Sequence, residues 1–218
     1  MDIFDAVKQG SRQEVEALLS ENPNVVNEAN RAGLRPVMLA LYSGQREIAA
    51  RLREAMESAN IWEAAALGEM EAVKDLIASD PALKDAVAPD GFTPLGLAAF
   101  FGQVEVVTRL LEAGADPDTP SENQMAVYPI NSAAANRSQE TALKLVQVLT
   151  AHGADVNAAQ HSGWTPLHQA AAHGFAHLVD FLLEHGADPS LKSEDGRTAA
   201  DMALVGGFEE LAAKLGAA

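Results

Sequence analysis

The stretch that decides the fold runs from Asp90 to Gly102 and reads Asp-Gly-Phe-Thr-Pro-Leu-Gly-Leu-Ala-Ala-Phe-Phe-Gly. A close copy runs from Ser162 to Gly174 and reads Ser-Gly-Trp-Thr-Pro-Leu-His-Gln-Ala-Ala-Ala-His-Gly. Each copy is followed by an apolar run that ends in Gly-Ala-Asp, at residues 114–116 and 186–188. Self-similarity of this kind indicates an array of structural repeats, in place of one globular core.

Within the first copy, local signals predict two short helices. Thr93 is a good N-cap residue, and Pro94 fits the first helical position because it has no N–H to lose there. Gly102 ends this helix, and the apolar residues between Val104 and Leu111 line one face of a second helix. Helices this short are marginal in isolation. We therefore expect each pair to be stable only by burying its apolar face against its neighbours.

The first half of the chain is an approximate tandem duplication, because residues 1–58 and 59–116 match at one constant offset. Within each of these two blocks the turn glycines are 34 positions apart, as in Gly10 and Gly44. Gly44 and Gly68, in contrast, are only 24 positions apart. We therefore expect no projecting hairpin between the second and third units.

These motifs resemble the ankyrin repeat, and the resemblance covers nearly the whole chain. It implies an all-α fold: a solenoid of stacked antiparallel helix pairs joined by β-hairpin-like loops, with a cap at each end. We expect a single array with units at 1–32, 33–58, 59–90, 91–123, 124–161, 162–194 and 195–218. Its helices are expected at 2–9, 12–20, 36–42, 45–57, 60–67, 70–78, 94–101, 104–113, 129–135, 139–151, 166–173, 176–185, 199–205 and 208–215. The last unit lacks the Pro and His of the motif and contains Glu209 and Glu210, so we expect a cap with a polar outer face.

Charge and composition narrow the classes of partner. The net charge of −16 makes nucleic acid and anionic membranes poor partners, whereas a basic partner would be attracted. The alternative explanation is that the excess of acidic residues only keeps an elongated surface soluble. No run approaches the roughly 20 apolar residues of a membrane span. Residues 1–5 lack the basic start and apolar core of a signal peptide, and the chain has no cysteine, so we expect a cytoplasmic protein.

Catalytic and metal-binding motifs are not evident in the sequence. No nucleophile elbow, phosphate-binding loop or dinucleotide-binding glycine pattern occurs, so we expect a protein that is not an enzyme and needs no cofactor. All six histidines lie between residues 152 and 185, but their spacing argues against a metal site, because Gly174 separates His173 from His177. The resemblance implies that His168 forms hydrogen bonds within and between repeats.

The resemblance also implies where a partner would bind: on the hairpin tips and the outward face of the first helix in each pair. Aromatic side chains are favoured interface anchors because they bury a large area at a modest entropy cost. We therefore expect a partner protein or peptide to contact Tyr42, Phe92, Phe100, Phe101 and Trp164, with Gln124, His161 and Arg197 as contacts at the tips. The alternative for Phe92, Phe101 and Trp164 is packing between neighbouring units. Trp62 falls on an inward position and is expected in the core.

The leading functional hypothesis is a non-catalytic module or adaptor that binds another protein. A second is an acidic inhibitor or immunity-type protein that masks a basic partner, and a third is a metal- or small-molecule-binding protein built on the histidine-containing units. The second unit is rich in arginine, and the third unit, which follows it in the sequence, is rich in acidic residues. These charges either pair with one another or form a binding surface with two signs of charge.

Overall fold

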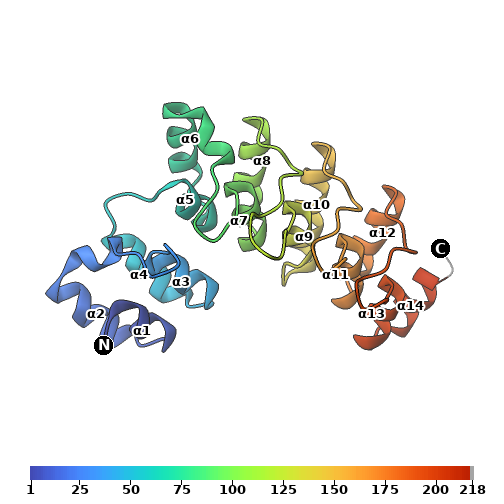
Figure 1. Ribbon diagram of the computed structural model, residues 1–218, viewed down its shortest axis with the longest axis horizontal. Helices are drawn as coiled ribbons and strands as arrows, with labels where there is room; N and C mark the ends of the chain where they lie inside the picture. Colours follow the sequence, from blue (N-terminus) through green and yellow to red (C-terminus); the bar gives the residue numbers. More distant parts are fainter. Residues whose placement is uncertain (217–218) are drawn as a thin grey trace.

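The computed structural model describes residues 1–216, so the last two residues of the expected final unit lie outside it. The described residues form helix pairs and contain no strand. The pairs follow one another in a curved row with the two termini at opposite ends (Figure 1). The α-helices are α1 (Ile3–Lys8), α2 (Arg12–Glu21), α3 (Pro36–Tyr42), α4 (Arg46–Ala55), α5 (Ile61–Leu67), α6 (Met70–Ser79), α7 (Pro94–Phe101), α8 (Val104–Glu112), α9 (Pro129–Ala134), α10 (Gln139–Ala151), α11 (Pro166–Ala172), α12 (Ala176–Glu184), α13 (Ala199–Val205) and α14 (Glu209–Gly216).

Every expected helix is present, and its ends lie within two residues of the expected ones. Local capping explains this agreement: the Thr93 hydroxyl accepts the Gly96 N–H at 3.1 Å, and Gly102 ends α7 in the left-handed conformation. Two short 3₁₀ helices, η1 (Pro23–Asn27) and η2 (Pro81–Asp85), were not expected. Each follows an Asn or Asp whose side chain accepts the N–H two residues further on, and this local bond closes an extra turn.

The core consists of thin layers dominated by small side chains. Ala98, Ala133 and Ala170 lie at the centres of successive first helices and are fully buried. The buried hydrophobic residues form two clusters: one contains those of residues 3–56 together with Ala66, Ala88 and Leu97, and the other contains most of the remaining ones from Ala59 onward. Figure 1 agrees with this division, because α6, α8, α10 and α12 stand side by side whereas α4 is set apart. The first two units are therefore joined to the rest by a narrower contact.

Ion pairs bridge this junction between the second and third units. Arg53 donates to both carboxylate oxygens of Glu69, at 2.5 and 3.0 Å. Arg35 donates to Glu63 at 3.2 Å, and Glu63 is only 1% exposed. Of the two alternatives for these charges, pairing between neighbouring units is therefore the one that Arg35 and Arg53 follow.

We expect replacement of Arg53 by methionine to lower the free energy of unfolding by about 1 kcal/mol. A bidentate guanidinium–carboxylate pair is stronger than an ordinary surface pair. Both side chains are about a quarter exposed, however, and this exposure limits the contribution of the pair to stability. Arg12→Met is the matched control, because its pair with Glu47 is single, longer (3.4 Å) and mostly exposed; its effect should be close to zero. Urea unfolding of both variants measures the difference, and equal losses would show that the junction pair has no special role.

Candidate protein-binding surface

The loops before α7, α11 and α13 are tight hairpin-like turns, here called fingers. Each is closed by a backbone hydrogen bond: Ala88 N–H to Phe92 O (2.8 Å), Gln160 N–H to Trp164 O (3.1 Å) and Ser193 N–H to Arg197 O (2.9 Å). A glycine with positive φ sits at the tip of each, namely Gly91, Gly163 and Gly196. The turn needs the left-handed conformation at this position, which glycine adopts at little steric cost.

Neighbouring fingers are also joined to one another through the backbone. The Glu122 N–H donates to the Gly91 carbonyl at 2.7 Å, and the His161 N–H donates to the Met125 carbonyl at 2.9 Å. The Glu194 N–H completes the series by donating to Ser162 O at 3.0 Å. The fingers before α7, α9, α11 and α13 thus form one hydrogen-bonded row, and their tips hold fixed positions relative to one another.

The finger before α9 departs from the others. Ala126 occupies the position of the tip glycine and has a φ of 45°, a conformation that is unfavourable for alanine. Two exposed side chains, Gln124 and Met125, precede it, and Met125 is 58% exposed. This finger therefore presents a strained turn with a flexible apolar side chain at its tip, a combination that the sequence analysis did not single out.

An aromatic cluster connects the second and fourth units. The ring of Tyr42 on α3 lies 6.0 Å from that of Phe100 and 5.4 Å from that of Phe101, both on α7. Phe100 and Phe101 meet edge to face at 5.0 Å. Between these helices in the chain, α5 carries Ala66 at the position that Tyr42 and Phe100 occupy in their units. The small side chain leaves room for the rings to meet, and such aromatic pairs stabilise beyond their buried area.

Asp90, at the tip of the finger before α7, is the polar partner of this cluster. The Tyr42 hydroxyl donates to Asp90 Oδ2 at 2.7 Å, and the Phe92 N–H donates to Oδ1 at 3.3 Å. Burial, and secondarily the hydrogen bond to Asp90, raises the pKa of Tyr42 far above its ordinary value. Tyr42 therefore remains a donor at neutral pH and ties the finger to α3.

The expected contact residues differ in exposure. Phe100 is 44% exposed, and Gln124, His161 and Arg197 are exposed at the tips. The half-buried members pack against the two core clusters: Tyr42, Phe92 and Phe101 against the N-terminal one and Trp164 against the other. The structure thus gathers Tyr42, Phe100 and Phe101 into one cluster and places Trp164 in a later unit. Trp62 is half-buried, and its indole N–H donates to the Ala86 carbonyl at 2.8 Å.

His168 forms the hydrogen bonds that the resemblance implies. Its Nδ1 lies 3.2 Å from the Thr165 amide nitrogen and 2.8 Å from the Thr165 hydroxyl. Its Nε2 lies 3.1 Å from the Arg197 carbonyl oxygen in the next finger, so Nε2 carries the proton because that carbonyl can only accept. In the fifth unit Asn131 replaces this histidine, and its side-chain amide donates to Ala158 O and Trp164 O, each at 3.1 Å. Both residues thus tie a first helix to the following finger.

Within residues 1–216, no group of three or more His, Cys, Asp or Glu side chains is placed to hold a metal ion. In the same range, no helix has the length and the apolar character that crossing a bilayer requires.

The prediction that the last unit has a polar outer face is wrong in part. Glu209 and Glu210 are exposed as expected, but Leu204 and Val205 are 56% and 73% exposed. Leu204 occupies the position that Ala171 fills in the preceding unit, where the side chain is fully buried by the next pair. The residue remains exposed because no further pair follows α13 and α14 in the described chain.

Comparison with known proteins gives the family. A model described as "Ankyrin repeats (3 copies)" matches residues 130–216, and one described as "Ankyrin repeat" matches residues 90–122; together they match more than half of the chain.

Three relatives illustrate the similarity. "Ankyrin repeat, SAM and basic leucine zipper domain-containing protein 1" of Saimiri boliviensis boliviensis is 33% identical over 112 residues, which are 51% of this chain and 23% of the relative. "B-cell lymphoma 3 protein homolog" of Mus musculus is 40% identical over 90 residues, or 41% and 19%. "Ankyrin repeat and SAM domain-containing protein 6" of Rattus norvegicus is 30% identical over 129 residues, or 59% and 12%. The match spans less than a quarter of the length of each of these relatives. On the family models and the helix-pair architecture together, this chain belongs to the ankyrin-repeat family.

Proposed function

We propose that this chain is a non-catalytic interaction module that binds another protein, or a peptide, across its fingers and first helices. Ankyrin repeats are generally protein–protein interaction modules. The observation that carries the proposal is Phe100, a large aromatic side chain that is 44% exposed and braced by Phe101 and Tyr42. A braced aromatic ring loses little conformational freedom when a partner covers it, so more of the burial contributes to affinity.

The rest of the proposed surface follows the row of fingers. Gln124, His161 and Arg197 are exposed along it, with Met125 between the first two. Trp164 supplies a second, half-buried aromatic anchor two units after Phe100. The backbone bonds between fingers support a preorganised surface, which suits an extended partner segment that contacts several units in turn.

Pull-down from a native extract tests the proposal. Alanine at both Phe100 and Trp164 is expected to reduce partner retention at least tenfold, because buried aromatic anchors typically contribute about 2 kcal/mol or more each. Lys144→Ala is the control, since Lys144 is an exposed side chain on α10, a second helix, and its removal should change nothing. Unchanged retention of every partner by a folded double variant would refute the proposed surface.

The acidic character supports the second candidate, an inhibitor or immunity-type protein that masks a basic partner. A net charge of −16 would speed association with a basic protein, and salt would screen the attraction. If the chain is such an inhibitor, we expect the Kd of a captured partner to rise at least tenfold between 50 and 300 mM salt. A Kd that is unchanged over that range would indicate that the affinity comes from the aromatic anchors and not from the net charge.

A further inference from the structure

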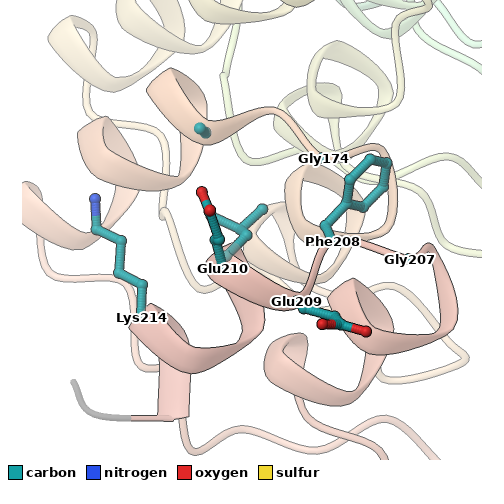
Figure 2. Close-up of a pocket in the computed structure, with 8 residues that line it drawn as sticks. Gly174, Gly207, Phe208, Glu209, Glu210 and Lys214 are labelled. Atoms are coloured by element: carbon teal, nitrogen blue, oxygen red, sulfur yellow. The ribbon is translucent and has the colours of Figure 1, made fainter.

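A second surface lies at the opposite ends of the helices from the fingers, in the last two helix pairs. Because α11 begins directly after its finger and ends at the turn before α12, this turn is a full helix length from the finger. The corresponding turn joins α13 to α14. Between the two turns is a hollow of about 610 Å³, shown in Figure 2 with its lining side chains. This volume falls in the range of ligand pockets.

Phe208 forms the apolar wall of this hollow. It is 37% exposed, and its ring lies against the backbone of the preceding turn, as Figure 2 shows. A Cβ placed on Gly174 would be 2.4 Å from the ring, so the close approach depends on glycine. Leu211 and Ala176 extend the apolar lining.

The residue at position 208 of the last unit varies among the earlier units, and the sixth unit also has a phenylalanine there, Phe175. The second and fourth units have glutamine at this position, Gln45 and Gln103. The Gln103 amide donates to the Ala66 carbonyl at 3.0 Å and so caps the preceding first helix. Phe208 cannot make such a bond. The stack therefore does not require a phenylalanine here, and the exchange replaces a capping amide with an accessible ring.

The charge at the rim of the hollow is negative. Glu209 and Glu210 line it and are exposed, and within residues 1–216 neither has a Lys or Arg partner at ion-pair distance. Lys214 also lines the hollow, but its ammonium group is paired with Asp180 of α12. Figure 2 shows Glu210 and Lys214 projecting beside the hollow. The unmatched charge is thus that of the two glutamates.

We propose that this hollow docks a segment of another protein in which a large apolar side chain is flanked by lysine or arginine. The apolar side chain packs on Phe208 and Leu211, and the flanking cations pair with Glu209 and Glu210. A second copy of the chain is disfavoured as the occupant. A symmetric contact would bring the same glutamates of two copies together, and each copy carries a net charge of −16.

A random library of 12-residue peptides displayed on phage, selected against the full chain, is the probe. We expect recovered peptides that have Lys or Arg beside Leu, Phe or Trp. Their binding should weaken at least tenfold in Phe208→Gln and at least fivefold in Glu210→Lys. Glutamine is the matched replacement because Gln45 and Gln103 occupy this position in folded units, and thermal melting confirms that each variant is intact. Phe100→Ala should retain the binding, which separates this surface from the fingers.

Three results would overturn the proposal. Recovery of no peptide whose binding depends on Phe208 would show that the hollow is not a docking site. Phe208-dependent peptides without an excess of Lys and Arg would refute the stated partner chemistry. Light scattering that finds a dimer in the unmodified chain but a monomer in Phe208→Gln would assign the surface to a second copy.

Discussion

Replacing Gly91 by alanine is expected to lower the free energy of unfolding by about 3–4 kcal/mol. Gly91 has a φ of +89°, and a Cβ there would lie 2.9 Å from the backbone of Glu122 and Asn123 in the next finger. The left-handed conformation costs alanine about 1–2 kcal/mol, and overpacking against atoms that cannot rotate away typically costs about 1–3 kcal/mol more. Relief of the clash would also strain the Glu122 N–H···Gly91 O bond that joins the two fingers. Urea unfolding measures the loss.

The chain supplies its own control for this prediction. Gly196 occupies the same finger position with a φ of +80°, but no atom lies within 4 Å of its Cβ position. Gly196→Ala should therefore cost only the strain, about 1–2 kcal/mol. Gly163→Ala should resemble Gly91→Ala, because the backbone of Ser193 and Glu194 approaches its Cβ position to 3.0 Å. Equal losses at all three positions would show that contact between fingers contributes little.

The helices were predictable from the sequence because their signals are local. Thr, Pro and Gly sit at the capping positions of α7 and α11, and the apolar spacing of α8 and α12 is unambiguous. The short link between α4 and α5 is likewise visible in the spacing of Gly44 and Gly68. The contacts across that link were only partly visible, since charge composition suggested pairing but did not identify Arg53 and Glu69 as the partners.

The candidate surface was less predictable because exposure depends on residues far away in the chain. Whether Tyr42 is free or packed depends on Ala66, whose small side chain lets Phe100 and Phe101 reach it. Asp90 is the first residue of the motif quoted above, but its bond to Tyr42, 48 positions earlier, has no local signal. Comparison of units aligns Phe208 with Gln45, Gln103 and Phe175, which does not predict its exposure, because Phe175 at the same position is half-buried.

Replacing His168 by alanine is expected to lower the free energy of unfolding by about 3 kcal/mol, with the last unit most affected. The substitution leaves a cavity and removes the hydrogen bonds to Thr165 and to the Arg197 carbonyl, in a site that is 1% exposed. His168→Asn is the matched variant, because Asn131 already donates to the next finger from the equivalent position. It should cost only about 1 kcal/mol. Losses of the same size in both variants would mean that the bond to the following finger is unimportant.

His168 also makes the free energy of unfolding of the array depend on pH, in a direction that follows from its pKa. Burial lowers the pKa of His168 below its ordinary value of 6.5, and the bond to the Arg197 carbonyl offsets this only in part. The unfolded chain therefore takes up the proton first, so this contribution to stability is complete above about pH 6.5 and is lost as the pH falls below it. Hydrogen bonds to their carboxylates also lower the pKa values of Asp188, Asp195 and Asp201, but their ordinary value is 3.8, so their effect begins in more acidic solution. Urea unfolding at pH 7.5 and pH 5.5 should show a smaller drop in His168→Asn than in the unmodified chain, and an equal drop in both would assign the dependence to another group.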